Sequence, residues 1–284
     1  MSRPTIPRLQ ILAAAALFST GGAAIKACTL DSWQVASFRS GVAALFLIAV
    51  MPAWRQFWNP RCLVVGIGYA STMILYVTAN KLTTAANTIF LQSTAPLYLL
   101  VLGPWLLRER LGLRDLVFTV TLAAGAVLFF VGVDPPMKTA PAPLRGNLLG
   151  ALTGLSWALT ILGLRWLGRG QPLATVDLSG AAVVAGNLLA FLIALPLALP
   201  VVQAHPVDWL VIAFLGLMQI GLAYICLTRG VRGVSALEVS LLLLLEPVLA
   251  AVWAWLAHGE RPGPWSLAGC LIILAATAAR AFRR

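Results

Sequence analysis

The sequence predicts an all-α integral membrane protein with ten transmembrane helices, arranged as two inverted five-helix repeats. Composition gives the first indication: 60% of the 284 residues are hydrophobic and only 10% are charged, with a mean hydropathy of +0.91. A soluble domain has about 25% charged residues. The chain also contains apolar runs of about 20 residues, which are long enough to cross a hydrocarbon layer of about 30 Å as helices. Finally, a set of landmark residues occurs twice.

The breaks between apolar runs define the spans. They are expected at 9–29, 33–51, 61–80, 84–106, 113–133, 146–167, 175–200, 207–229, 234–257 and 264–282. Only Leu30, Asp31 and Ser32 separate the first two. A merged helix of about 40 residues would be twice as long as a bilayer needs, so two helices with a tight turn are expected. The first span follows Arg3 and Arg8 and is similar to a signal peptide. We expect it to be retained, because its removal would leave nine spans.

The repeated landmarks indicate an internal duplication. Four residues recur 151 positions later without a gap: Pro96, Glu109, Arg110 and Gly112, matched by Pro247, Glu260, Arg261 and Gly263. Because five helices are an odd number, the second copy must enter the membrane from the opposite side. The expected units are therefore 1–140 and 141–284. Two inverted halves can open a shared midplane site to each side in turn, which favours alternating access.

The basic residues predict the orientation. With the N-terminus in the cytoplasm, 14 of the 20 Lys and Arg residues fall on the inner side and two within spans. The four on the outer side are Lys81, Lys138, Arg145 and Arg261. This bias favours cytoplasmic termini in a bacterial inner membrane. It also explains the net charge of +11 without a nucleic-acid surface, so no nucleic-acid partner is expected.

The landmarks resemble a known repeat. In the second half, Leu245-Glu246-Pro247, Gly259-Glu260-Arg261 and Gly269 resemble the end of an EamA repeat of the drug/metabolite transporter superfamily. In the first half, Ala95-Pro96, Arg108-Glu109-Arg110 and Gly125 are similar to the other copy. The resemblance covers nearly the whole chain and implies ten helices in two inverted units. Within the superfamily, the chain is most similar to bacterial exporters of aromatic and other neutral amino acids.

The resemblance implies a secondary exporter of small amphipathic metabolites, above all aromatic and other neutral amino acids. The related four-helix multidrug exporters use a glutamate in their first helix, which this chain lacks, so proton coupling would need another group. The chain also has no Gly-x-x-x-x-Gly-Lys-Ser/Thr loop for ATP. We expect no cofactor and no metal, since the four cysteines lie in or beside different spans without close spacing.

Other functions remain open at this stage. An anion exchanger similar to sugar-phosphate carriers would use Lys26, Arg39 and Lys81, but these lie towards the outer side. A permanently open pore fits poorly with kinked inverted halves. An enzyme would need clustered acids, histidines or a nucleophile, whereas His205 and His258 lie in or beside outer loops. The chain is therefore not expected to be an enzyme.

Acids and prolines in the spans are candidates for the transport machinery. Glu246 is expected near the middle of the ninth span, where a carboxylate usually faces a cavity or a partner. It is a candidate for binding a substrate ammonium group or a proton. Alternatively, it packs helices by bonding at the backbone gap that Pro247 opens. Pro96 and Pro247 are expected to kink equivalent helices and shape the cavity wall. Glu238 is a candidate gate or a solvated interfacial acid.

The remaining candidates are aromatic and polar. Trp157 and Phe18, at comparable depths in spans six and one, are candidates to stack with substrate or to pack the core. The polar candidates would either bind the charged ends of a zwitterion or join helices by hydrogen bonds. They are Tyr76, Asn87, Gln92, Ser93, Thr94 and Tyr224.

Two basic residues and a glycine stripe complete the interpretation. Lys26 and Arg39 are expected to extend to the interface, with attraction of a substrate carboxylate as the alternative. Gly146, Gly150 and Gly154 have the spacing that lets helices approach closely. They favour tight packing within the bundle, and a monomer is sufficient for transport.

Overall fold

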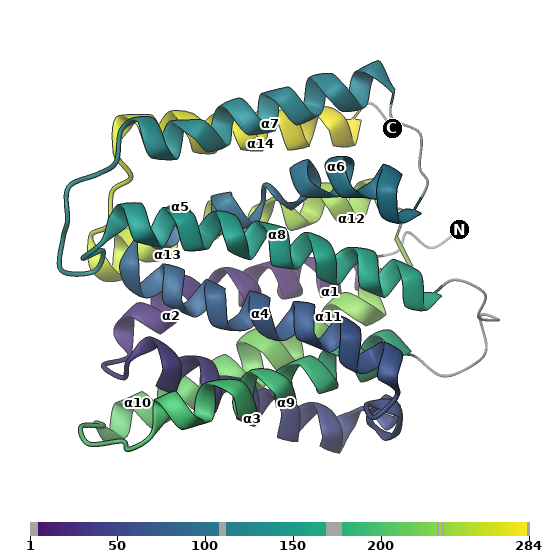
Figure 1. The fold of residues 1–284 in the computed structure, drawn as a ribbon, viewed down its shortest axis with the longest axis vertical. Helices are drawn as coiled ribbons and strands as arrows, with labels where there is room; N and C mark the ends of the chain where they lie inside the picture. Colours follow the sequence, from purple (N-terminus) through teal and green to yellow (C-terminus); the bar gives the residue numbers. More distant parts are fainter. Residues whose placement is uncertain (1–4, 108–111, 169–177, 232, 235, 283–284) are drawn as a thin grey trace.

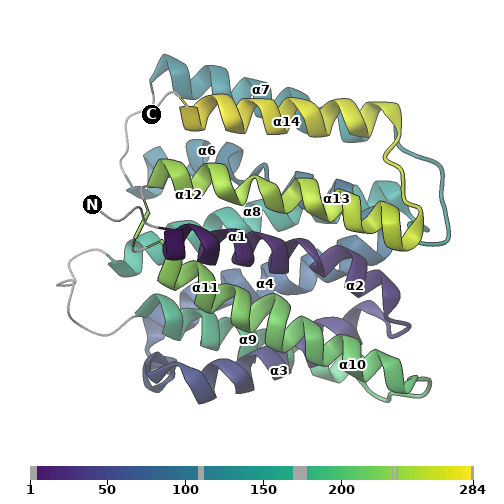
Figure 2. The same ribbon diagram turned by 180° about the vertical axis from the view of Figure 1, so that it is seen from behind.

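The structure is a computed structural model, and it describes residues 5–107, 112–168, 178–231, 233–234 and 236–282. It is a bundle of helices that run roughly parallel and antiparallel to one another (Figures 1 and 2). Within the described residues, ten helical segments are long and apolar enough to cross a membrane. Their ends agree with the predicted spans to within a few residues, which confirms the prediction of ten spans. The landmarks Glu109 and Arg110 lie outside the described residues.

The first half of the chain contributes the first five spans. The helices are α1 (Thr5–Ser19), α2 (Gly21–Ala27), α3 (Ser32–Val50), η1 (Pro52–Gln56), α4 (Pro60–Leu82), α5 (Ala85–Gln92), α6 (Ala95–Leu107) and α7 (Leu113–Val131). The first span consists of α1 and α2, and the fourth of α5 and α6. Asp31 caps α3, because its carboxylate accepts from the backbone of Trp33 and Gln34. This cap produces the tight turn predicted between the first two spans.

The second half contributes the other five. The helices are α8 (Pro143–Gly168), α9 (Leu178–Ala198), α10 (Pro206–Phe214), the π-helix η2 (Leu215–Leu222), α11 (Ala223–Gly230), α12 (Ala236–Leu243), α13 (Leu245–His258) and α14 (Pro264–Phe282). The eighth span is α10, η2 and α11, and the ninth is α12 and α13.

The bundle has two ends, which we name by the chain. The terminal side is where α1 begins and α14 ends, at the right of Figure 1. The far side, at the left, carries the connections 28–31, 83–84, 132–142, 199–205 and 259–263. α7 and α14 lie together at one edge of the bundle, and α3 and α9 at the opposite edge (Figures 1 and 2). The helices between them, which include α1, α4, α8 and α11, surround the centre.

Both landmark prolines follow breaks in their spans. Pro96 is the second residue of α6, after a break at Ser93 and Thr94, and Pro247 is the third residue of α13, after a break at Leu244. Proline is tolerated in the first turn because its missing N–H would have no helical partner there. The sequence interpretation placed the prolines at kinks inside helices; in the structure each span is interrupted shortly before its proline, which lies in the first turn of the following helix.

Glycines allow the closest helix contacts. A Cβ at Gly125 of α7 would lie 2.9 Å from Ile273 and 3.3 Å from the Gly269 carbonyl of α14. The stripe of Gly146, Gly150 and Gly154 packs α8 against the backbone of Thr83 and the Leu91 segment of α5. This is the tight packing within the bundle that the small-residue spacing predicts.

Candidate functional site

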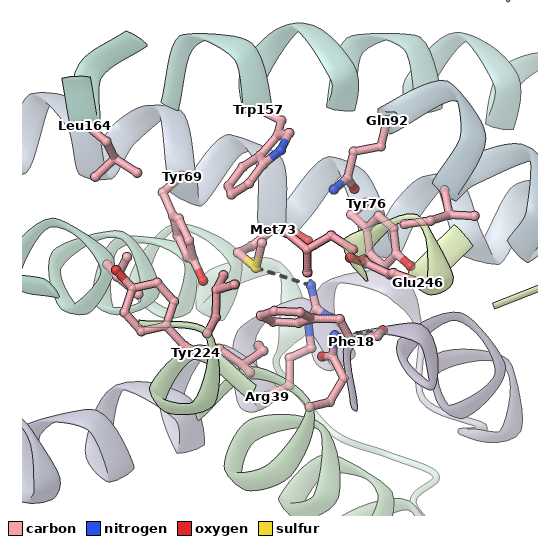
Figure 3. A pocket seen from close by; sticks show the side chains of 16 residues that line it. Phe18, Arg39, Tyr69, Met73, Tyr76, Gln92, Trp157, Leu164, Tyr224 and Glu246 are labelled. Atoms are coloured by element: carbon pink, nitrogen blue, oxygen red, sulfur yellow. Dashed lines mark hydrogen bonds between the residues drawn. The ribbon is translucent and has the colours of Figure 1, made fainter. Parts of the chain in front are cut away.

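A cavity of about 240 Å³ lies in the middle of the bundle. Helices from both halves of the chain contribute side chains to it. Its walls are largely apolar and aromatic, and they are formed by Phe18, Arg39, Tyr69, Met73, Tyr76, Ile89, Gln92, Trp157, Leu164, Val183, Gln219, Ile220, Tyr224, Leu227, Leu243 and Glu246. Figure 3 shows Leu164 and Tyr224 at one end of this group and Gln92 and Glu246 at the other.

The cavity extends towards the terminal side. Leu164 lies close to the end of α8, and Leu227 close to the end of α11, which are both terminal-side ends. Val183 lies near the terminal-side start of α9. At the deeper end, Gln92 closes α5 and Glu246 begins α13. The two broken spans therefore place their breaks beside the deep end of the cavity.

Six of the nine predicted substrate-binding residues line the cavity: Phe18, Tyr76, Gln92, Trp157, Tyr224 and Glu246. The other three, Asn87, Ser93 and Thr94, do not line it. The Asn87 amide donates to Asn147 and Thr83, whereas the Ser93 and Thr94 hydroxyls donate to backbone carbonyls of their own helix. The Asn87–Asn147 contact joins α5 to α8, as in the helix-joining alternative of the sequence interpretation, whereas the Ser93 and Thr94 bonds are local and join no helices.

Glu246 faces the cavity. In the described part of the chain it makes no hydrogen bond and no ion pair. The alternative interpretation, a packing acid bonded to a neighbouring helix, requires such a contact. By contrast, Glu238 pairs with Arg8 of α1 at the terminal side, where the two side chains are 30% and 40% exposed.

Arg39 is the more buried of the two charged residues named in the cavity wall. It was expected to extend to the interface, and this prediction is wrong: the residue is 1% exposed. One guanidinium nitrogen, Nη2, donates to the Met73 carbonyl at 3.1 Å and lies 3.7 Å from the Met73 sulfur (Figure 3). The Tyr76 ring centre is 5.9 Å from Cζ. Helix α3 turns Arg39 inward towards α4, so the side chain cannot reach the interface.

Lys26 is also buried rather than at the interface. Its ammonium group lies 2.9 Å from a carboxylate oxygen of Glu260, and both side chains are 2% exposed. It also donates to the carbonyls of Thr83 and Thr139, at 2.7 and 2.5 Å. The other Glu260 oxygen accepts from the Ala85 backbone at the start of α5. The prediction that Lys26 extends to the membrane interface is wrong, because Glu260 and two carbonyls replace water around its ammonium group.

More polar contacts join the two halves at the far side. Asp208 accepts from the backbone and the hydroxyl of Thr29, at 2.7 and 2.6 Å. A His258 ring nitrogen is 2.8 Å from the Ala23 carbonyl. We call the group of Lys26, Glu260, Thr29, Asp208 and His258 the far-side cluster. Gly259 makes the turn before Glu260 with a φ of +68°, which glycine adopts without strain.

Some cavity residues were not predicted as site residues. Tyr69 and Met73 precede Tyr76 by seven and three positions on α4, so a helical face was recognisable once Tyr76 was chosen. Gln219 lies in the π-helix η2, a rare element that is frequent at functional sites. The sequence has no clear sign of a π-helix, since the surrounding residues are uniformly apolar.

Comparisons with known proteins agree with this architecture. The model of the EamA-like transporter family matches residues 6–131 and 144–279, and each match contains five candidate spans. A protein of Pseudomonas aeruginosa, described as uncharacterized protein PA1977, is 33% identical over 279 residues, covering 92% of this chain and 90% of that protein. An uncharacterized transporter of Bacillus subtilis, YxxF, is 24% identical over 90% of this chain and 83% of its own length.

Two further comparisons are more limited. An uncharacterized transporter of Methanothermobacter thermautotrophicus is 25% identical over 188 residues, which is 66% of this chain and 54% of that protein. A crystal structure with 21% identity matches 99% of this chain and 98% of its own chain with a TM-score of 0.64, which shows a shared fold.

Family matches over both halves, together with ten helices of membrane-spanning length among the described residues, indicate a multi-pass membrane transport protein. The chain belongs to the EamA-like transporter family, within the drug/metabolite transporter superfamily.

Proposed function

We propose that this protein is a secondary transporter that exports small amphipathic metabolites, above all aromatic and other neutral amino acids, by alternating access. The observation that carries the proposal is the central cavity, whose walls come from both family matches. Its volume of about 240 Å³ is below the roughly 300–1,000 Å³ typical of pockets for drug-sized ligands. A small metabolite is therefore the appropriate occupant.

The chemistry of the wall supports an amphipathic solute. Trp157, Phe18 and Tyr69 offer aromatic faces, which pack against apolar and aromatic side chains. Arg39, Gln92 and Glu246 supply polar and charged groups at the deeper end. A solute with an apolar side chain and a polar head would match both parts of the wall.

The contrast between the two ends supports alternating access. The cavity extends to the terminal side, whereas the far-side cluster joins the two halves by buried polar contacts. In our proposal the cluster is the closed gate of the state described here, and its separation opens the site to the far side. The inverted arrangement of the two halves is part of the same proposal, because inverted halves can exchange these two conformations.

Orientation follows from the distribution of charge. The excess of Lys and Arg on the terminal side supports our proposal that both termini lie in the cytoplasm of a bacterial cell. The cavity would then receive substrate from the cytoplasm, as an exporter requires. We propose that a monomer without a cofactor is sufficient, since the cavity is formed within one chain.

Cysteine labelling tests the orientation. In a cysteine-free background, Lys138→Cys on the far side should react with an impermeant maleimide added to intact cells. Arg55→Cys in η1, on the terminal side, should react only after permeabilisation; both native residues are exposed. The reverse pattern would overturn the orientation.

Transport itself is tested in proteoliposomes with labelled phenylalanine and an imposed pH gradient. We expect saturable flux without ATP, inhibited by other neutral amino acids in a competition panel. Unsaturable linear flux would indicate a pore, and the absence of flux for every amino acid would contradict the proposal.

An anion exchanger is the second candidate, because Arg39 places a positive charge in the cavity wall. Glu246 in the same wall disfavours solutes with several negative charges. Sugar phosphates are therefore included in the competition panel, and strong inhibition by them would favour this alternative.

A further inference from the structure

Two charges of opposite sign line the cavity, and the protein leaves both incompletely satisfied. Arg39 is 1% exposed, and Nη2 donates only to Met73. Its buried Nε has no hydrogen-bond partner. Among the described residues, no carboxylate lies within ion-pair distance of Arg39. Since a guanidinium carries five N–H donors, most of its hydrogen-bonding capacity is unused.

Lys26 shows that this is not the general treatment of buried cations in the protein. Its ammonium group has a carboxylate and two carbonyls within 2.9 Å. A buried charge without compensation is costly, and proteins normally pair it. Lys26, outside the cavity, is therefore paired with an anion. Arg39, in the cavity wall, has no carboxylate within ion-pair distance among the described residues.

Glu246 carries the complementary charge. It lines the same cavity and makes no ion pair or hydrogen bond in the described part of the chain. Glu246 interacts electrostatically with Tyr76, and the Tyr76 ring centre is 5.9 Å from Cζ of Arg39; Figure 3 labels all three residues. The two charges are therefore on neighbouring parts of the wall, and they are not paired with each other.

We infer that Arg39 and Glu246 together recognise a zwitterion: Arg39 binds the substrate carboxylate, and Glu246 binds the ammonium group. Guanidinium and carboxylate form charge-assisted, often bidentate hydrogen bonds, which a free Nε and terminal nitrogens can supply. Because a zwitterion carries one charge of each sign, it can pair with Arg39 and Glu246 at the same time. The aromatic wall near Trp157 then receives the apolar side chain. This inference rests on the proposed function, because it concerns the same cavity.

The arrangement also predicts which solutes are excluded. An amine without a carboxylate leaves Arg39 unpaired, and a carboxylate without an amine leaves Glu246 unpaired. Sites built around buried polar groups strongly reject ligands that leave those groups without partners. Selectivity for zwitterions should therefore depend on the two residues separately, each acting on one end of the ligand.

The test uses three ligands of one shape: phenylalanine, phenethylamine, which lacks the carboxylate, and 3-phenylpropionate, which lacks the ammonium group. Binding to purified wild-type protein is measured by calorimetry, and inhibition of phenylalanine flux in proteoliposomes. We expect both analogues to bind at least about 10-fold more weakly than phenylalanine, because each leaves one charge unpaired. Equal affinities for the three ligands would overturn the inference.

Variants then assign the two ends. Arg39→Gln should weaken phenylalanine and 3-phenylpropionate at least about 10-fold, with little change for phenethylamine. Glu246→Gln should give the opposite pattern, weakening phenylalanine and phenethylamine. Arg39→Lys, which keeps the charge, should retain part of the carboxylate preference and shows whether the position tolerates substitution. An equal loss for all three ligands in folded variants would overturn the inference.

The outcomes separate this inference from the proposed function. If wild-type protein shows no saturable amino-acid flux, the proposed function fails. If phenylalanine is transported and the variants do not divide the analogues by charge, only the recognition by Arg39 and Glu246 fails. Arg61→Gln is the matched control for Arg39→Gln, because Arg61 is exposed, contacts Trp166 and does not line the cavity.

Discussion

The far side and the cavity treat buried charge in opposite ways. At the far side, Lys26 and Glu260 neutralise each other, and their remaining hydrogen-bonding groups contact backbone. In the cavity, Arg39 and Glu246 lack charged partners among the described residues. Because unpaired buried charges are costly, the fold gains nothing in stability from the second arrangement. Lys26 and Glu260 therefore hold the two halves together, whereas Arg39 and Glu246 are available to a solute.

The largest expected effect comes from breaking the far-side pair. Lys26→Met leaves Glu260 as an uncompensated buried charge, which typically costs about 3–5 kcal/mol of unfolding free energy. In the double variant Lys26→Met/Glu260→Gln the charge is gone, and the glutamine can still accept from Ala85. We therefore expect the double variant to recover much of the loss. Denaturant unfolding in detergent micelles measures both, and additive losses would show that the pair is not coupled.

An intermediate effect is expected in the cavity. Trp157→Ala removes a large aromatic face from the wall, so phenylalanine flux should fall about 10-fold, or about 1.4 kcal/mol of binding. The folded yield should change little, because Trp157 is only partly buried. Trp166→Ala serves as the control, since it removes the same side chain outside the cavity. Equal flux in the two variants would remove Trp157 from the proposed site.

The smallest effect is expected at the terminal side. Arg8 and Glu238 form an ion pair between α1 and α12, but both side chains are partly exposed. Exposed pairs contribute less than about 1 kcal/mol. Glu238→Gln should therefore lower unfolding free energy far less than Lys26→Met in the same assay. A loss as large as that of the far-side pair would mean that the terminal side is held together as firmly as the far side.

The sequence predicted more of the fold than of the site. Apolar runs, proline positions and glycine spacing are local properties, so the ten spans and the packing of Gly146, Gly150 and Gly154 could be predicted from them. The positions of the breaks were less well predicted, because a proline within a span is compatible with both a kink and a new helix start. The same ambiguity did not affect the number of spans.

Depth and residue type were sufficient to choose some of the residues that line the cavity. Glu246 and Trp157 are unusual residues for the middle of a span, and both line the cavity. Asn87 and Thr94 lie at similar depths on the same span as Gln92, but their side chains bond to nearby protein groups. Depth alone does not say which face of a helix a residue occupies relative to distant helices. The sequence therefore could not show which of the polar candidates face the cavity and which bond to neighbouring helices.

Lys26 and Arg39 show most clearly what each level decides. The sequence by itself determined that both are basic residues within apolar spans, and that the chain has ten apolar runs long enough to cross a membrane, because these properties depend on composition and local order. The tertiary structure alone decided their roles. Packing brings Glu260, from the other half of the chain, to Lys26, while α4 brings Met73 and Tyr76, but no described acid within ion-pair distance, to Arg39. The free energy of a buried charge depends on the groups that surround it in space, and these come from residues far away in the sequence.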